Sequence, residues 1–250
     1  MARGIVFAFI TLAAVQAAEY RDVNRTVPLS PTGMVTIDTH KGSVHVTTWD
    51  RPEVDIKARI EEEPGAPMDR RRFDATEVRI DASADAVHIR THYPDWCCNL
   101  TDGNNPEVRY TIQMPRMGRL TVHDHRSETE VTDLGGALDI ETHRGTVRVH
   151  RLGGPLQLST HRGDATVDFT AFTGNSIIDT YRGSVELSLP RDSRFDMRAD
   201  LGRHAIVDTD FAMMARTVGR RSESMHGSVN GGGPTLELKT YRGNIRLHGR

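Results

Sequence analysis

The chain has 250 residues, of which 37% are hydrophobic and 26% charged, and its formal net charge is −2. This balance is that of a soluble globular protein, and all-β folds of this length occur as single domains. The near-zero charge argues against a dedicated nucleic-acid-binding protein, which would carry a basic excess.

Residues 1–18 read as a secretory signal peptide. Arg3 supplies the positive charge, the apolar stretch from Ile5 to Val15 is too short to span a bilayer, and small residues follow at Ala17 and Ala18. The alternative is an N-terminal anchor that is not cleaved. We expect an exported protein, periplasmic or extracellular and associated with the cell surface, with no membrane span after signal removal. A lead-in over 19–34 would follow the signal.

The half of the chain over 35–117 is irregular, but apolar and polar residues still alternate in it, for example from Val54 to Ile60. Alternation predicts half-buried strands. The sequence also predicts a short helix near Met68 to Phe73 and loops over Glu61–Pro67 and Pro94–Pro106. A sandwich-like domain is the competing interpretation of this half.

The only two cysteines, Cys97 and Cys98, are adjacent. They cannot link distant segments, because neighbouring Cα atoms lie only about 3.8 Å apart. A loop thiol pair without a special role is one interpretation. A redox-active vicinal disulfide, an intermolecular bridge or a soft-metal contact is the other.

The half over 118–250 is built on an internal repeat. A phrase of the form Thr-His/Tyr-Arg/Lys-Gly recurs, and Gly145, Gly163 and Gly183 mark steps of 18 and 20 residues. Copies in this half begin at Thr142, Thr160, Thr180 and Thr240, with a variant at Asp124 that carries Ser127 in place of glycine and a looser copy over Ser224–Val229. One further copy begins at Thr39, in the first half.

Each copy is flanked by residues that alternate with period two, so it reads as a strand, a bend at Arg-Gly and a second strand. Glycine suits the bend because it accepts positive φ. Gly135-Gly136 and Gly153-Gly154 mark a second corner. A single unit cannot bury its apolar faces, but units stacked on one another bury them in a continuous core. The sequence therefore predicts an all-β fold: a single β-solenoid domain, parallel β-helix-like, over 35–250.

A family resemblance supports this prediction. The segments Tyr110–Pro115, Leu120–Val122, Leu134–Thr142 and Arg144–Val147 resemble the bacterial putative-adhesin β-strand-repeat family, a domain of unknown function. The resemblance covers roughly Val35 to the C-terminus. It implies a β-helix-like solenoid at the cell envelope and no catalytic residues. Ser127 and the steady His/Tyr-Arg pair depart from the family pattern.

In a parallel stack, equivalent positions lie about 4.8 Å apart, so the phrase predicts two columns of side chains. One holds Arg126, Arg144, Arg162, Arg182 and Arg242, and the other holds His125, His143, His161, Tyr181 and Tyr241. Arginine contacts carboxylate or phosphate in a bidentate manner, and aromatic rings offer flat faces for stacking. Together the columns would bind an anionic or sugar polymer. Alternatively they are structural, with the arginines paired to Glu141, Asp164 or Asp179.

Other chemistries have weaker signals. A metal site would use His123, His125 and His143, but residues on neighbouring strands point in parallel rather than converge on one ion. A glycan-cleaving enzyme would need paired carboxylates, with Asp139, Asp168 and Asp179 as the candidates. No nucleophile motif, phosphate loop or dinucleotide fingerprint is present, so no catalytic residue, metal or cofactor is assigned.

The sequence thus predicts a non-catalytic exported envelope module, an adhesin-like protein whose partner is an envelope polysaccharide or a surface protein and not nucleic acid. Two alternatives remain: a carbohydrate-active enzyme on a solenoid, and a self-assembling structural protein. The prediction of self-assembly rests on the last repeat, which runs to Arg250 and would leave an uncapped end open to strand pairing.

Overall fold

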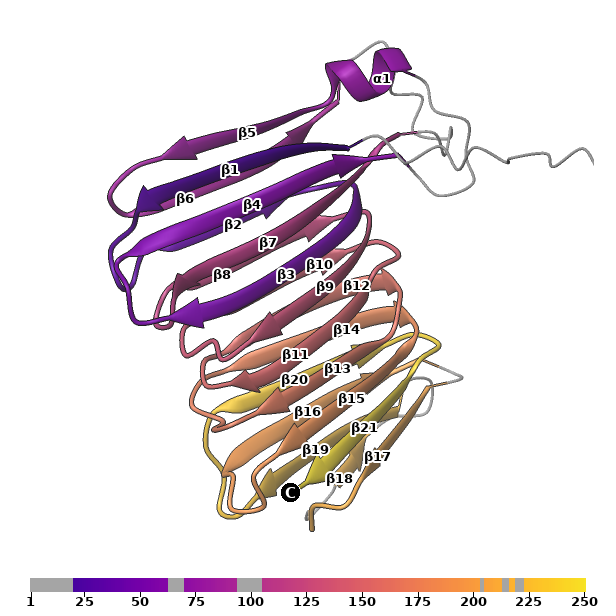
Figure 1. Ribbon diagram of the computed structural model, residues 1–250. Coiled ribbons are helices and arrows are strands. Elements are labelled where there is room, and N and C mark those ends of the chain that lie inside the picture. Colours follow the sequence, from indigo (N-terminus) through magenta and orange to yellow (C-terminus); the bar gives the residue numbers. More distant parts are fainter. Residues whose placement is uncertain (1–19, 63–69, 94–104, 203–204, 213–215, 219–222) are drawn as a thin grey trace, which may run out of the picture.

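A computed structural model describes residues 20–62, 70–93, 105–202, 205–212, 216–218 and 223–250, and it is nearly all β (Figure 1). The all-β class predicted from the sequence is confirmed. The predicted signal peptide, Cys97 and Cys98, and most of the two predicted loops lie outside the described residues.

The strands form two large sheets. Sheet A has ten strands in the spatial order β1 (Tyr20–Pro28), β4 (Glu53–Glu61), β7 (Glu107–Pro115), β3 (Lys41–Trp49), β9 (Arg126–Thr132), β11 (Thr146–Leu152), β13 (Ala165–Phe169), β15 (Ser184–Leu189), β21 (Asn244–Gly249) and β17 (Ile206–Thr209). Sheet B has eleven in the order β18 (Arg216–Val218), β19 (Glu223–Val229), β16 (Phe195–Leu201), β20 (Thr235–Thr240), β14 (Ser176–Arg182), β12 (Leu156–Arg162), β10 (Leu138–Thr142), β8 (Arg119–Asp124), β2 (Met34–Asp38), β6 (Ala86–His92) and β5 (Glu77–Ala82).

One short helix, α1 (Arg70–Ala75), lies close to the helix predicted near Met68 to Phe73 and buries Phe73 against the core. Among the described residues, no helix is long and apolar enough to cross a membrane.

From β8 to β15, consecutive strands lie alternately in sheet B and sheet A. Within this run, β8, β10, β12 and β14 pair in parallel in sheet B, and β9, β11, β13 and β15 pair in parallel in sheet A. We call a strand of sheet B, the bend after it and the next strand of sheet A a rung. Thr142 pairs with Thr160, and Thr160 with Thr180, so the repeated phrase lies at the same place on successive rungs.

The core lies between the sheets and follows the alternation in the sequence. On one rung, Leu138 and Ile140 of β10 and Val147 and Val149 of β11 are at most 1% exposed. The inward side chains of all rungs form one hydrophobic cluster. Each such aliphatic side chain contributes about 1.5–3 kcal/mol on burial, and this stabilises the stack.

The bends need glycine mainly because the rungs touch there. A Cβ on Gly163 would lie 1.9 Å from the carbonyl oxygen of Gly145. A Cβ on Gly183 would lie 2.0 Å from that of Gly163, and Gly183 also has φ +141°. At the second corner a Cβ on Gly154 would lie 2.0 Å from the oxygen of Gly136. Close approach of backbones, more than positive φ, therefore explains the repetition of glycine.

The bend with Ser127 forms as well. Asp124 stands where later rungs have threonine, and its Oδ1 accepts hydrogen bonds from the Ser127 N–H (3.0 Å) and the Thr142 hydroxyl (2.9 Å). On the next rung, the Gly145 N–H donates to Thr142 Oγ1 at 2.9 Å. Burial raises the pKa of Asp124 despite these hydrogen bonds.

The last repeat does not lie at the end of the stack, so the expectation of an uncapped end at Arg250 is wrong. Strands β20 and β21 pair with β14 and β15 on one side and with β16 and β17 on the other. The looser copy of the phrase over Ser224–Val229 is also no bend: it runs straight through β19, antiparallel to β16.

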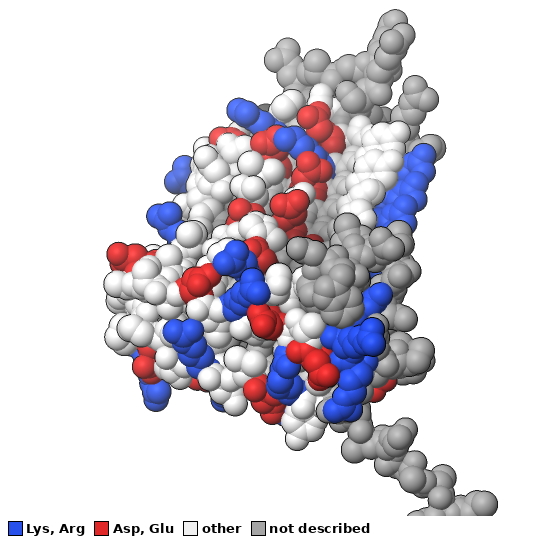
Figure 2. Space-filling view, turned by 90° about the horizontal axis from the view of Figure 1, so that it is seen from above, with Lys and Arg blue, Asp and Glu red and all other residues white. Residues whose placement is uncertain are grey.

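The N-terminal part mixes both pairing directions. β2 and β3 pair in parallel with strands on each side, whereas β1, β4 and β7 form an antiparallel run and β5 pairs antiparallel with β6. Seen from the end that carries β1 and β5, the basic and acidic side chains are interspersed (Figure 2). Charged side chains on these edge strands disfavour pairing with another chain.

Candidate functional site

A continuous column of aromatic rings follows the bends between the sheets, and we call it the ring ladder. It consists of Tyr93, His40, His125, His143, His161, Tyr181 and Tyr241, with successive ring centroids 6.0, 4.8, 4.7, 4.7, 4.7 and 5.0 Å apart. The structure thus brings the five predicted rings together. It adds His40, which the phrase at Thr39 already contained, because β3 pairs in register with β9.

The ladder does not offer flat faces to a ligand over most of its length. His40, His125 and His143 stack on one another with interplanar angles of 3° and 8°, and Tyr181 stacks on Tyr241 at 6°. His161 is turned by 74° from His143 and 66° from Tyr181, and Tyr93 is turned by 74° from His40. The expectation of stacking faces is therefore corrected: within each stack the ring faces cover one another, so these faces are not open to a ligand.

The predicted arginines occupy the next position along each rung. Arg162 pairs with Arg182 in register, and Arg126 with Lys41. Within the described part of the chain, Arg126, Arg144 and Arg162 form no ion pair, and in particular none with Glu141, Asp164 or Asp179. Each of these three arginines is exposed. They form an uncompensated basic stripe, which we call the arginine column.

The two C-terminal arginines of the column differ from the other three. The guanidinium group of Arg182 lies 5.6 Å from the ring centroid of Tyr181, and that of Arg242 lies 5.5 Å from the centroid of Tyr241. Such cation–π contacts hold the guanidinium in place without neutralising its charge. The positive charge therefore continues to the rung formed by β20 and β21.

A groove of about 560 Å³ runs beside the ladder on the side of sheet B. Its lining includes the ladder histidines His40, His125, His143 and His161, together with Asp38, His123 and Glu141. The lining residues come from or adjoin the neighbouring strands β6, β2, β8, β10 and β12, so the groove crosses several strands and fits an elongated ligand better than a small one.

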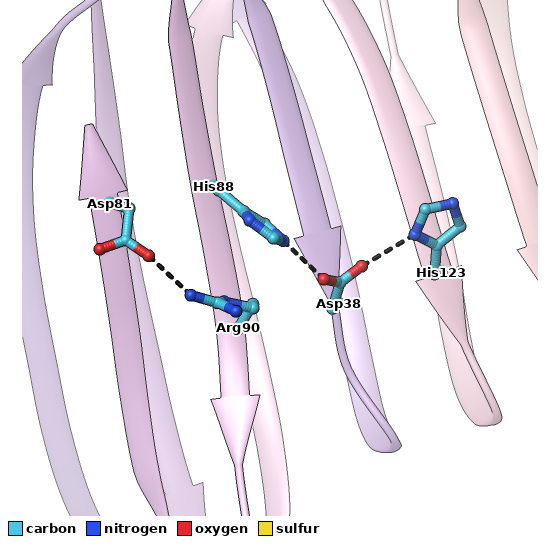
Figure 3. A network of polar contacts seen from close by, with 5 residues as sticks. All are labelled: Asp38, Asp81, His88, Arg90 and His123. Atoms are coloured by element: carbon cyan, nitrogen blue, oxygen red, sulfur yellow. Dashed lines mark hydrogen bonds and ion pairs between the residues drawn. The ribbon is translucent and has the colours of Figure 1, made fainter. Parts of the chain in front are cut away.

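On the outer face of sheet B, Asp38 lies between two histidines, as Figure 3 shows. Its Oδ2 is 2.5 Å from His88 Nε2 and its Oδ1 is 2.8 Å from His123 Nδ1. Burial alone would raise the pKa of Asp38, but the hydrogen bonds from His123 and His88 together lower it. Sequence reasoning missed this cluster, because its members lie on three strands that are distant in the chain.

Three ladder histidines are held in the neutral form near pH 7. Burial first, and then the positive charges of neighbouring rings and of Lys41 and Arg126, lower the pKa of His40. Burial followed by the adjacent arginines lowers the pKa of His125. Burial, the neighbouring histidines and the arginines beside it lower the pKa of His143. These three stacked imidazoles therefore resist protonation.

The residues considered for other chemistries are kept apart. His123 binds Asp38, whereas His125 and His143 stack in the ladder. Within the described residues, no group of three or more His, Cys, Asp or Glu is arranged to hold a metal ion.

The carboxylates considered for glycan cleavage also fail to converge. Asp168 lies in β13 of sheet A, where Arg250 pairs with it at 3.0 Å, whereas Asp139 and Asp179 lie in β10 and β14 of sheet B. The structure therefore offers these three residues no common site.

No family model and no curated protein matches the chain. Among solved structures, it is similar to a putative cell adhesion protein from Clostridium sporogenes (TM-score 0.45, 9% identity, covering 92% of this chain and 100% of that one). It is also similar to a putative adhesin from Bacteroides fragilis (TM-score 0.35, 9% identity, covering 92% of this chain and 97% of that one). A third similar structure is a putative lipid binding protein from Parabacteroides distasonis (TM-score 0.29, 10% identity, covering 90% of this chain and 96% of that one). Likenesses at these TM-scores establish neither a shared fold nor a shared function.

Proposed function

We propose that the protein is a non-catalytic, exported envelope module that binds a linear anionic polymer, such as an acidic glycan, along the arginine column. We further propose that its rungs form a β-solenoid of the putative-adhesin β-strand-repeat type. The parallel register of the repeated phrase across β10, β12, β14 and β20 supports the solenoid. Export rests on the predicted signal over residues 1–18 and stays a prediction.

The observation that carries the proposal is the run of unpaired arginines at one position on consecutive rungs. Exposed arginines elsewhere in sheet A have carboxylate partners, such as Arg59 with Asp22, Arg148 with Glu128 and Arg151 with Asp133. Rungs stack about 4.8 Å apart, so the column presents a guanidinium at each such interval. A polymer with one anionic group per unit can meet several of them at once, and charge-assisted contacts to arginine are strong.

The ring ladder would contribute hydrogen bonds to the same ligand. Neutral imidazole edges carry one donor and one acceptor, and a phenol hydroxyl can do either. Tyr181 and Tyr241 are 40% and 51% exposed, so their hydroxyls can reach a ligand over the last rungs. These groups suit the hydroxyls of a sugar polymer, and they would add selectivity for a glycan to the charge attraction.

The test measures the retention of the mature chain, from Glu19 onward, on immobilised polygalacturonate, dextran sulfate and neutral dextran. We expect salt-sensitive retention on the two anionic polymers only. Arg126→Ala, Arg144→Ala and Arg162→Ala together should weaken binding about a hundredfold or more, since each charge-assisted contact is worth roughly 1.5–3 kcal/mol.

The matched control is the triple variant Arg59→Ala, Arg148→Ala and Arg151→Ala, which removes the same charge from paired arginines and should bind like the unaltered protein. Equal weakening of both variants, or no retention of the unaltered protein, would make the column structural. A released oligosaccharide or unsaturated product would instead favour an enzyme. Growth of the light-scattering mass with concentration would favour self-assembly.

A further inference from the structure

The described histidines with resolved contacts fall into two classes. Five lie within 4.0 Å of a carboxylate oxygen: His45, His88, His123, His150 and His248. The four ladder histidines, His40, His125, His143 and His161, have no carboxylate partner among the described residues and stack on other rings instead.

The charged groups around the ladder are unevenly placed. Cations flank it on its own rungs, namely Lys41, Arg126, Arg144 and Arg162. The carboxylates that face it are Asp124 at the first bend and, in the same groove, Asp38 and Glu141, with His123 beside them. Asp38 is already bound by His88 and His123, and Asp124 accepts the hydrogen bonds of its own bend. Among the described carboxylates of the groove, Glu141 is then the one left to offset positive charge on the ladder.

Protonation of the free ladder is therefore unfavourable. A proton on His125 would place a positive charge 4.7–4.8 Å from the rings of His143 and His40 and next to Arg126 and Arg144. One ring nitrogen, Nδ1 of His161, is buried and has no hydrogen-bond partner among the described residues. Within the described residues, the ladder histidines are thus surrounded by cations and other rings, and no carboxylate is paired with them.

We infer that His40, His125 and His143 of the ladder are a proton-linked part of the anion site: they stack on one another without a carboxylate partner in the free protein, and they take up protons when a polyanion lies along the arginine column. The inference rests on the proposed function and adds its regulation. Anionic groups of the ligand would supply the counter-charge that the ladder lacks, so affinity rises as the pH falls from 7.5 towards 5.5.

The direction follows from linkage. Well above pH 7, His40, His125 and His143 are neutral in the free and the bound protein, and the charge attraction for the ligand rests on the arginines alone. At lower pH the bound protein holds more protons than the free one, because the ligand raises the pKa of His40, His125 and His143. A rise of one pKa unit at a single histidine strengthens binding about tenfold below both pKa values.

The experiment uses the mature chain and dextran sulfate, whose sulfates do not titrate in this range. Affinity is measured by titration calorimetry at pH 7.5 and 5.5 and at constant ionic strength, in two buffers with different heats of ionisation. We expect binding about tenfold or more tighter at pH 5.5. We also expect a buffer-dependent heat that shows uptake of one or more protons per bound segment.

Two double variants locate the effect. His125→Gln with His143→Gln alters two groups that contact the ligand, so its affinity at pH 7.5 serves as its own reference, and it should lose most of the gain between pH 7.5 and pH 5.5. The control, His45→Gln with His150→Gln, removes two carboxylate-paired histidines and should keep the gain. An equal loss in both would assign the gain to overall charge and overturn the inference.

The outcomes separate the two proposals. Binding of the unaltered protein that is independent of pH and of the buffer overturns proton linkage and leaves the arginine site standing. Absence of binding at both pH values overturns the proposed function itself. Proton uptake is measured on the unaltered protein, so it decides the question even if the ladder variant fails to fold.

Discussion

The bends and the outer sheet faces place similar residue types in opposite surroundings. At the bends, backbones of successive rungs touch, so glycine, threonine and a ring recur from rung to rung, and histidine meets histidine. On the faces, each side chain has room, the residues vary, and histidine meets a carboxylate, as at Asp38. The comparison teaches that packing dictates the residues where rungs touch, whereas local charge pairing dictates them where they do not.

Adding one methyl group tests this contrast most strongly. Gly163→Ala would place a Cβ 1.9 Å from a backbone oxygen of the rung before, and we expect a loss of about 3 kcal/mol in the free energy of unfolding. Gly153 lies in the second corner, but the nearest atom to its Cβ would be 3.5 Å away. Gly153→Ala should therefore change stability by less than about 1 kcal/mol. Urea unfolding measures both, and similar losses would contradict the contact argument.

The buried threonines allow a finer test, because one position differs between two rungs. Thr142 Oγ1 accepts the Gly145 N–H and its hydroxyl donates to Asp124, whereas Thr160 Oγ1 has no partner within the described residues. Thr142→Val should lower the free energy of unfolding by about 1–3 kcal/mol, since it leaves buried polar groups unpaired. Thr160→Val should be nearly neutral. Thermal unfolding of both variants measures this difference. An equal effect would show that the hydrogen bonds of Thr142 do not stabilise the fold.

The smallest expected effect is the pH dependence of stability in the absence of ligand. The pKa values of His40, His125 and His143 are lowered from the usual 6.5. Above pH 6.5 these histidines are neutral in both states. As the pH falls through 6.5 and towards the folded pKa values, the unfolded chain binds more protons and stability is lost.

The Asp38 cluster should act in a separate, more acidic window. The pKa of Asp38 is lowered from 3.8 in the folded protein. Asp38 therefore stabilises the fold above pH 3.8, and this stabilisation is lost as the pH falls through the folded pKa. Melting temperatures between pH 7.5 and 3 should show both losses. His143→Gln should reduce only the loss of stability below pH 6.5, and Asp38→Asn should reduce only the loss at more acidic pH. A single loss affected equally by both variants would refute the separation.

Repetition made much of the site predictable. The phrase at Thr142, Thr160 and Thr180 recurs at steps that match one rung, so the columns of rings and arginines followed from the sequence. The variant with Ser127 could not be placed with the same certainty, because its bend depends on an aspartate in the threonine position. The angle between rings was also beyond the sequence, since it depends on side-chain torsions that neighbouring rungs adjust together.

The sequence by itself determined the all-β class, the period-two burial and the stacking of the phrase, because these depend on local alternation and on a repeat that each rung satisfies in the same way. Only the tertiary structure decided that β20 and β21 lie between β14–β15 and β16–β17, and that Asp38 meets His88 and His123. The reason is physical. Local patterns fix which face of a strand is buried, but which strands become neighbours is decided by the packing of segments that lie far apart in the chain.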